Sequence, residues 1–286
     1  MRIAVIDLFC GMGGFSQGAI DAGAEVILSV DSWDYAVKVH IENHPDVKII
    51  KMELGHPSHY RMFKRLVDEY RAKGYHVHIH GSPPCQALSN ASRHDASEGM
   101  PLVLWFLDLV ERCDPDSWSM ENVVPVRKRL PEGTPSVVLN SADFGVAQTR
   151  RRCYAGEGWV AEPSHSKEEW LGVIDVLPHL MLSPRVLKVN TAGGGASNSR
   201  RVNSQDSLIE LPSKTIHNNR PSLRTDEPQK IRSLTLPETL ILQGFNPDYK
   251  LDSAKTQKNR WTMVGNAVPP PVAAAVIRGV QNAVFN

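Results

Sequence analysis

Short apolar runs alternate with longer segments of helical spacing over the first half of the chain. Short runs rich in Val, Ile and Leu are typical of buried strands, and apolar residues that recur every three or four positions indicate helices. Strands are expected at residues 2–9, 26–30, 47–51, 76–80, 117–121, 136–140 and 152–155, and helices at 15–22, 35–43, 59–73 and 102–113. This alternation predicts an α/β fold with a mainly parallel sheet covered on both faces.

The pattern changes after about residue 156. Residues 190–225 are rich in Gly, Ser, Asn and Arg and have weak periodicity, which favours a loop-dominated region. Residues 264–284 return to an apolar helix able to pack against the first half. We therefore expect a larger domain of residues 1–155 and 258–286, and a smaller, loop-rich domain of residues 156–257.

A glycine-rich turn, DLFCGMGGFSQG (7–18), follows the first expected strand and opens a helix. Glycines permit a tight turn and a close approach of the backbone to a ligand, and the helix start offers free N–H groups. Asp31 ends the second strand, eighteen residues after Gly13, roughly where an acid reaches a ribose in dinucleotide folds. The turn departs from GxGxxG because Ser16 takes the place of the last glycine. The pattern favours a nucleotide-type ligand over an ordinary tight turn.

A second turn, GSPPCQALS (81–89), follows the fourth expected strand. Each proline fixes φ and removes an N–H donor, so Cys85 is carried on a stiff backbone. A cysteine attacks as its thiolate. From this stretch alone, a nucleophile and a structural thiol on a rigid loop are equally good interpretations. Both turns fall at carboxyl ends of strands, where ligands of such folds bind, so they are expected to face one cleft.

Two further polar runs follow in order, each beside an expected strand. The first is Glu121-Asn122-Val123, and the second is Gln148-Thr-Arg150-Arg-Arg152. Taken singly, each is readily explained as solvated surface. Their order after the cysteine turn is what indicates a catalytic site.

Composition narrows the class of protein. Hydrophobic content of 41% and charged content of 22% are ordinary for a globular protein. The four cysteines lie far apart without a CxxC pair, which argues against a zinc site and a disulfide framework. The apolar N-terminal run is too short for a membrane span and lacks the features of a secretory signal. The sequence thus predicts a cytoplasmic protein, in a prokaryotic cell or in the host of a virus, with no membrane partner.

Charge is uneven although the net charge is only +1. Residues 185–224 hold seven basic side chains against two acidic ones. Such a stretch fits either phosphate contact or a solvated loop surface. Separately, alternation along the fourth strand places His76, His78 and His80 on one face. A metal site is the alternative there, but we expect buried, hydrogen-bonded polar residues.

These motifs together carry a resemblance to a known family. They are DLFCGMGGFSQG (7–18), Asp31, GSPPCQALS (81–89), ENV (121–123), NSADFGVAQTRRR (140–152), RSLTLPETLILQGF (232–245) and VGNAVPPPVAAAV (264–276). In this order the chain resembles the DNA cytosine-5 methyltransferase family, which uses S-adenosylmethionine to methylate cytosine in DNA. The resemblance implies a Rossmann-like catalytic domain and a smaller target-recognition domain. Residues 156–231, which have no recognisable match, would hold the variable recognition region.

The resemblance implies four catalytic residues. Cys85 would add to carbon 6 of a flipped cytosine, which breaks its aromaticity and lets carbon 5 attack the methyl group. Glu121 would hold or donate a proton at N3. Arg152 would contact O2, with Arg150 supporting the site. No metal is required.

The resemblance also implies binding residues. The cofactor positions are Asp7, Phe9, Gly11, Gly13, Asp31, Ser32, Glu53, Pro83, Asn266 and Val268. Ser32 stands where the family often has a residue that stacks on adenine, and Trp33 follows it. Gln243 and Gly244 match a motif that organises the second domain. The expected DNA contacts are Gln86, Ser89, Arg185, Arg200, Arg201 and Arg220.

The expected partner is double-stranded DNA, which would hold the protein at the nucleoid. The cofactor product would be S-adenosylhomocysteine, and the protein is expected to be a monomer. A tRNA cytosine-5 methyltransferase is one alternative, but the Cys-Phe-Thr signature expected of that branch is missing. A catalytically silent DNA-binding relative is another. The intact Cys85, Glu121, Arg150 and Arg152 speak against it.

Overall fold

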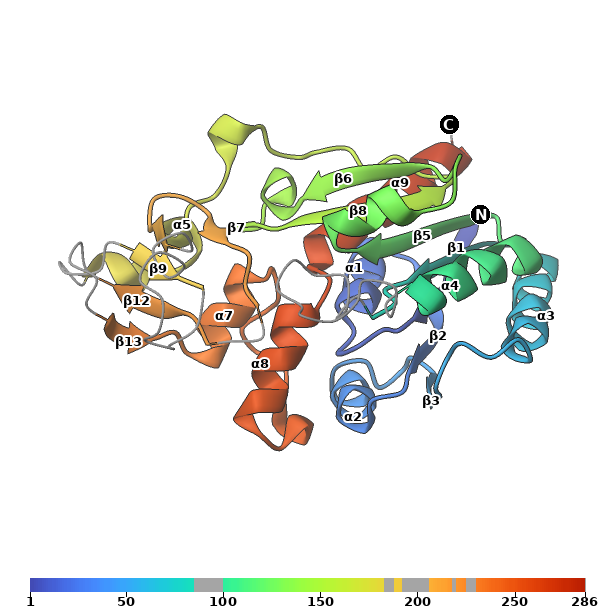
Figure 1. Ribbon diagram of the computed structural model, residues 1–286, viewed down its shortest axis with the longest axis horizontal. Coiled ribbons are helices and arrows are strands. Elements are labelled where there is room, and N and C mark those ends of the chain that lie inside the picture. Colours follow the sequence, from blue (N-terminus) through green and yellow to red (C-terminus); the bar gives the residue numbers. More distant parts are fainter. Residues whose placement is uncertain (85–99, 183–187, 192–205, 218–219, 225–229, 286) are drawn as a thin grey trace.

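The computed structural model describes residues 1–84, 100–182, 188–191, 206–217, 220–224 and 230–285. Within these residues a seven-stranded sheet has the order β3-β2-β1-β4-β5-β8-β6. The pairings of β3, β2, β1, β4 and β5 are parallel, and β8 runs antiparallel to both its neighbours. The predicted doubly wound, mainly parallel α/β fold is confirmed (Figure 1).

The predicted strands and helices agree with the described elements to within a few residues. The strands are β1 (Arg2–Leu8), β2 (Glu25–Asp31), β3 (Ile49–Lys51), β4 (Tyr75–Gly81), β5 (Ser117–Asn122), β6 (Ser136–Asn140), β7 (Gln148–Thr149), β8 (Arg151–Glu157), β9 (Lys188–Asn190), β10 (Asp206–Leu208), β11 (Ser213–Lys214), β12 (Ser222–Arg224) and β13 (Lys230–Ser233). The α-helices are α1 (Gly14–Asp21), α2 (Asp34–Asn43), α3 (His59–Ala72), α4 (Met100–Cys113), α5 (Val173–Val176), α7 (Leu236–Leu242), α8 (Gln257–Asn266) and α9 (Pro270–Phe285). Among these described helices, none is long and apolar enough to cross a membrane.

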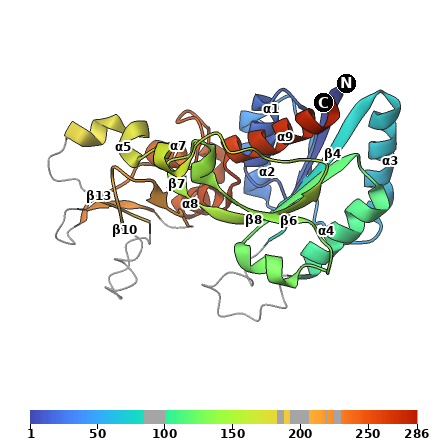
Figure 2. The same cartoon turned by 90° about the horizontal axis from the view of Figure 1, so that it is seen from above.

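Helices cover both faces of the large sheet because its central strands are apolar on both sides. On β1, Ala4, Ile6 and Leu8 join one core with α3 and α4, whereas Ile3 and Val5 join another with α1 and α9. Figure 2 separates α1 and α9 from α4 across the sheet. Helix α9 lies close to α1, since a Cβ added to Gly18 of α1 would meet the Pro270 carbonyl of α9 at 2.2 Å.

The strand order reverses between β1 and β4. Leu8, the last residue of β1, pairs with Gly81, the last residue of β4. The backbone N–H of Ser82 continues this pairing by donating to the Leu8 carbonyl at 3.1 Å. The glycine turn and the PPC turn therefore leave the sheet side by side at the topological switch point, where doubly wound folds bind their ligands.

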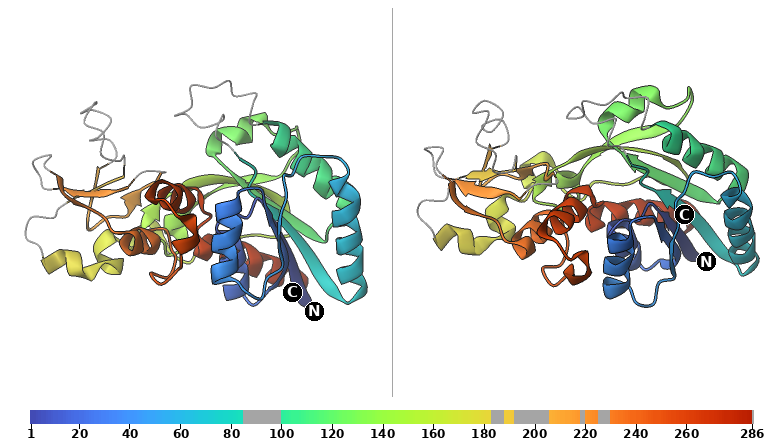
Figure 3. Two further views of the ribbon diagram at one scale, coloured as in Figure 1. Left: turned by 90° about the horizontal axis from the view of Figure 1, so that it is seen from below. Right: turned by 60° about the horizontal axis from the view of Figure 1, so that its bottom comes forward.

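The part of the chain after residue 156, here called the second region, contains a four-stranded antiparallel sheet. Its order within the described residues is β10-β9-β12-β13. Its core includes Val173, Ile209, Ile216 and Leu234. Figure 3 shows this sheet and α5 on one side of the molecule, with α8 toward the larger sheet. Residues of α7, α8 and the chain between them also pack with Ala36 and Val39 of α2. The expected domain division stays a prediction.

The three histidines of β4 are hydrogen-bonded polar residues, as the sequence predicts. His78 and His80 are fully buried, and both nitrogens of each ring bond to serine hydroxyls. Across the described part of the chain, no group of three or more metal-ligating side chains is present.

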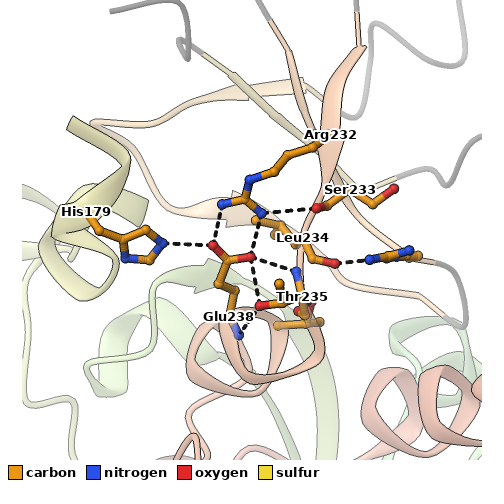
Figure 4. A network of polar contacts seen from close by, with 8 residues as sticks. His179, Arg232, Ser233, Leu234, Thr235 and Glu238 are labelled. Atoms are coloured by element: carbon orange, nitrogen blue, oxygen red, sulfur yellow. Dashed lines mark hydrogen bonds and ion pairs between the residues drawn. The ribbon is translucent and has the colours of Figure 1, made fainter. Parts of the chain in front are cut away.

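A buried carboxylate, Glu238 of α7, ties together three segments of the second region (Figure 4). Arg232 of β13 donates to both of its oxygens, at 2.6 and 2.8 Å. Its other donors are Thr235 through N–H and Oγ1, and His179 at 2.8 Å. Burial alone raises the pKa of Glu238, but these hydrogen bonds outweigh it and lower the pKa from an ordinary 4.5 to about 2.

Glu238→Gln should therefore destabilise the protein. Because the folded-state pKa is below the unfolded one, the carboxylate's contribution is complete above pH 4.5 and is lost as the pH falls toward 2. We expect Glu238→Gln to cost about 3 kcal/mol at pH 7, measured by urea unfolding. The control Glu69→Gln, which removes an exposed pair with Lys73, should leave the free energy of unfolding nearly unchanged. Equal effects of the two substitutions would contradict this role for the network.

Candidate active site

The glycine turn has a left-handed backbone at several positions. Phe9, Gly11 and Gly13 have φ of 57°, 55° and 97°. This conformation is strained for Phe9, and such strain clusters at functional sites. A Cβ added to Gly11 would meet no atom within 4 Å, so the turn borders open space at this point. Gly11 thus leaves room for a ligand to approach the backbone.

Gly13 is required for a different reason. A Cβ there would lie 2.8 Å from His44 Nε2 and 2.9 Å from His40 Cδ2, in addition to the strain of its positive φ. The sequence predicts Gly13 as a cofactor contact, and the structure places it against these two histidines of α2 and the chain after it.

Asp31 fixes the turn from the neighbouring strand. Its Oδ2 accepts from the Gly11 N–H and its Oδ1 from the Trp33 N–H, both at 2.8 Å. Burial raises the pKa of Asp31, while these hydrogen bonds lower it in part. The carboxylate therefore lies at the end of β2, directly beside the open side of the glycine turn.

Asp7 lies deeper than the other expected cofactor residues. It is fully buried, and its Oδ2 accepts from Ser16 Oγ of α1 at 2.6 Å. Burial raises the pKa of Asp7 to about 7. The contact with Ser16 anchors the start of α1 to β1, so Asp7 supports the turn from beneath.

The remaining cofactor positions gather around the same edge of the sheet. Ser32 and Glu53 are exposed beyond the ends of β2 and β3. Asn266 is exposed at the end of α8, and Val268 is buried against Gly14. Pro83 is buried in the neighbouring PPC turn.

The PPC turn is held by the next strand. Asn122, the last residue of β5, donates from Nδ2 to the Pro83 carbonyl at 3.1 Å. Cys85, Gln86 and Ser89 lie outside the described residues. The described cysteines are Cys10, Cys113 and Cys153, and all three are buried. Burial raises the pKa of Cys113 to about 12 and of Cys153 to about 11, so these thiols are poor nucleophiles at neutral pH.

Glu121 and Arg152 form an ion pair beside this turn. Arg152 Nε lies 3.1 Å from Glu121 Oε1, and the two side chains are 17% and 10% exposed. Glu121 belongs to β5 and Arg152 to the antiparallel strand β8, which pairs with it. A carboxylate and a guanidinium are thus placed together at the edge of the sheet, mostly shielded from solvent.

The Gln148–Arg152 run also holds the second region in place. Gln148 is fully buried; its Nε2 donates to the Leu242 carbonyl and to Gln243 Oε1, and its Oε1 accepts from the Ile216 N–H at 2.8 Å. Arg150 Nη1 donates to the Ile216 carbonyl at 3.2 Å. Strand β11 pairs in parallel with β7 at the same place. Arg150 is thereby buried between the two regions, behind the Glu121–Arg152 pair.

Two residues at the candidate site are not singled out by the sequence. Gln148 stands out in the sequence only as part of the Gln148–Arg152 run, which is itself the signal. His217 follows Ile216 directly, and its pKa is lowered by burial and by Arg150 and Arg152. An imidazole from the second region therefore lies near Arg150 and Arg152. No local pattern marks it, because its neighbours come from about 65 residues earlier in the chain.

The expected DNA contacts are only partly described. Arg185, Arg200 and Arg201 lie outside the described residues. Arg220 is exposed, donates from Nε to the Leu234 carbonyl at 2.9 Å, and has its guanidinium carbon 5.7 Å from the ring centroid of Trp261. Its role toward DNA stays a prediction.

Comparison with known proteins relates this chain to DNA methyltransferases. The family model for C-5 cytosine-specific DNA methylases matches residues 3–130 and 161–282. The Type II methyltransferase M1.HphI of Haemophilus parahaemolyticus is 27% identical, over 98% of this chain and 87% of its own length. The Type II methyltransferase M.HindV of Haemophilus influenzae is 28% identical, over 97% of this chain and 96% of its own length.

Solved structures show the same fold. The methyltransferase EhMeth of Entamoeba histolytica superposes with a TM-score of 0.65 at 15% identity, over 99% of both chains. With the strained glycine turn, the Glu121–Arg152 pair and the family match along most of its length, this chain belongs to the C-5 cytosine-specific DNA methylase family.

Proposed function

We propose that this protein transfers a methyl group from S-adenosylmethionine to carbon 5 of cytosine in double-stranded DNA, with S-adenosylhomocysteine as product. The observation that carries the proposal is the convergence of three segments at one edge of the sheet. These are the glycine turn, the PPC turn and the Glu121–Arg152 pair. Membership of the family implies a methyl donor, and its identity as S-adenosylmethionine is what the resemblance of the sequence motifs implies.

The glycine turn and its surroundings fit this cofactor. Gly11 borders open space, Asp31 offers a partly buried carboxylate beside it, and Glu53 is exposed one strand further out. An acid in Asp31's place suits ribose hydroxyls. When bound, the cofactor supplies an electrophilic methyl group. Phe9, Ser32, Pro83, Asn266 and Val268 would complete its walls.

Cys85 is the proposed nucleophile. Two prolines precede it, Asn122 fixes the carbonyl of Pro83, and the described thiols are buried with raised pKa values. Its thiolate would form a bond to carbon 6 of the cytosine, which makes carbon 5 nucleophilic. After methyl transfer, loss of the carbon 5 proton and breaking of the S–C6 bond release the product.

Glu121 and Arg152 would recognise the base. A carboxyl group placed in a shielded pocket can hold a proton at N3 as the adduct forms. Arg152 Nε already pairs with Glu121, and the rest of its guanidinium can donate to O2. Arg150, buried against Ile216, would keep Arg152 and the second region in register.

DNA is the proposed substrate because the relatives with extended matches are named Type II methyltransferases. The second region, whose exposed basic side chains include Arg220, would contact the duplex while the target cytosine is flipped out. Residues Gln86, Ser89, Arg185, Arg200 and Arg201 remain candidate DNA contacts.

Cys85→Ser should abolish catalysis without unfolding the protein. We expect methyl transfer to fall by about 1000-fold or more, measured with tritiated S-adenosylmethionine, because a serine hydroxyl is a far weaker nucleophile. The matched control is Cys113→Ala, which removes a buried thiol remote from the sheet edge and should retain activity within a few-fold. Near wild-type activity of Cys85→Ser would exclude the covalent mechanism.

Asp31→Asn should weaken cofactor binding. An amide would place an N–H group against the N–H of Gly11 or Trp33 and distort the turn. Calorimetric titration with S-adenosylhomocysteine should show an affinity lower by roughly 10- to 100-fold. Asp34→Asn, three residues on, removes exposed pairs with Lys38 and Lys51 and should change the affinity little. If both variants bind alike, Asp31 has no role at the cofactor site.

Substrate class can be tested directly. With a tritiated cofactor, the wild-type enzyme should methylate duplex DNA and leave tRNA unmethylated, because the Cys-Phe-Thr signature expected of tRNA enzymes is missing from the sequence. Incorporation into tRNA alone would instead place the protein with the tRNA branch.

A further inference from the structure

The carbonyl of Met12, in the middle of the glycine turn, is bonded by a residue from much later in the chain. Tyr249 donates its hydroxyl hydrogen to this carbonyl oxygen, although 237 positions of sequence separate the two residues. Tyr249 lies in the connection between α7 and α8, residues 243–256, and is 8% exposed. A segment of the second region therefore reaches the turn that is proposed to hold the methyl donor.

His44, the residue after α2, completes the bonding of this hydroxyl. Its Nε2 lies 3.1 Å from Tyr249 Oη. A phenol has one hydrogen, and Tyr249 gives its hydrogen to Met12, so the histidine must be the donor in this contact. His44 is 5% exposed and burial lowers its pKa, so the ring is neutral at pH 7 with its hydrogen on Nε2. We call these two residues the His–Tyr pair.

The His–Tyr pair fixes one end of a peptide group whose other end is fixed within the turn. The carbonyl of Met12 and the N–H of Gly13 belong to the same planar peptide. Its oxygen accepts from Tyr249, and its N–H donates to the Cys10 carbonyl at 2.9 Å. This peptide can rotate only if both hydrogen bonds break. It directly precedes the left-handed backbone of Gly13, whose φ is 97°, so it helps to set the shape of the turn.

The connection that carries Tyr249 is docked on α2. Asn43 of α2 donates from Nδ2 to the Lys250 carbonyl at 2.9 Å and accepts from the Lys250 N–H at 2.8 Å. Leu251 and Ala254 of the connection are buried in one core with residues of α2 and α8, which lie side by side (Figure 1). The hydroxyl is thus presented to the turn from a well-packed support.

We propose that Tyr249, oriented by His44, is a positioning residue for the methyl donor. It holds the Met12–Gly13 peptide in place before the donor arrives, so that binding does not have to order the glycine turn. The proposal rests on the proposed function, in which this turn binds S-adenosylmethionine. Because the hydroxyl comes from the second region, the affinity for the donor depends on how that region is docked.

Loss of the hydroxyl should loosen the turn before any ligand is added. Tyr249→Phe keeps the aromatic ring in the core and removes only the donor to Met12. Amide hydrogen exchange of the cofactor-free protein should be at least about 10-fold faster in residues 9–15 than in wild type, because one of the two bonds on the peptide is lost. Residues 59–72 of α3, which are remote from the turn, should exchange at the wild-type rate.

The same substitution should weaken binding of the cofactor. Calorimetric titration with S-adenosylhomocysteine should show an affinity about 10-fold lower for Tyr249→Phe, since binding must then order the turn. In methylation of duplex DNA, KM for S-adenosylmethionine should rise by a similar factor, and kcat at saturating cofactor should stay within about two-fold of wild type. This split is expected of a residue that prepares the turn and does not touch the reacting atoms.

Two substitutions at His44 test the orienting bond independently. An amide N–H of glutamine lies near the position of the histidine Nε2, so His44→Gln can still donate to Tyr249 and should keep the affinity within about two-fold. His44→Met has no donor and should lower the affinity about five-fold. These two variants decide the matter if Tyr249→Phe does not accumulate in folded form.

Matched controls separate this role from general support of the fold. Asn43→Ala removes the side chain that bonds Lys250 twice and docks the same connection, but it does not touch the turn. It should lower the free energy of unfolding in urea and leave the affinity nearly unchanged. Tyr75→Phe removes a hydroxyl that donates to Glu25 at the opposite edge of the sheet, so it should change neither the affinity nor the exchange of the turn.

Several results would overturn the proposal. One is a folded Tyr249→Phe that binds S-adenosylhomocysteine as tightly as wild type, and another is an unchanged rate of exchange in its turn. A loss of affinity in Asn43→Ala equal to that in Tyr249→Phe would also overturn it, because docking of the connection alone would then explain both. If the wild-type protein does not bind S-adenosylhomocysteine, the proposed function has failed instead, and the exchange measurement still decides whether Tyr249 holds the turn.

Discussion

The backbone hydrogen bond from Ser82 to Leu8 holds the whole site in register. It extends the parallel ladder of β1 and β4 by one residue, so that both strands end at the same level. The glycine turn must then leave beside the PPC turn, and β5, the next strand along, delivers Glu121 and Asn122 to the same edge. The sheet determines where the chemistry occurs, and the turns determine what that chemistry is.

A second constraint joins the recognition region to this edge. Buried amides are stable only when their groups are paired, and Gln148 pairs with Leu242, Gln243 and Ile216 at once. Because Gln148 and Arg152 belong to the same short run, only a few residues of chain separate the side chain that pairs with Glu121 from the side chain that bonds to the second region. A shift of the second region would therefore reach the Glu121–Arg152 pair through a few bonds.

Much of this arrangement is predictable from local patterns. The alternation of strands and helices gives the parallel sheet, and turns after β1 and β4 give its functional edge. The roles of individual residues are less predictable, because they depend on contacts between distant segments. Position 13 must be glycine because a Cβ there would clash with the rings of His40 and His44. Asp7 accepts a hydrogen bond from Ser16, which follows the glycine turn in α1.

His217 reaches the arginines only through the β7–β11 pairing, which no local periodicity encodes. The histidines of β4 are a mixed case. Alternation predicts their shared face, but the serines that complete their bonds come from β5, about forty residues later.

A strained glycine turn, a stiffened thiol and a shielded carboxylate–guanidinium pair would together form one methylating centre. Bisulfite sequencing of DNA from cells that express the protein tests this most directly, since methylation at carbon 5 protects cytosine from conversion. We predict protected cytosines confined to one short sequence. Complete conversion, equal to that in cells without the protein although it accumulates in folded form, would contradict it.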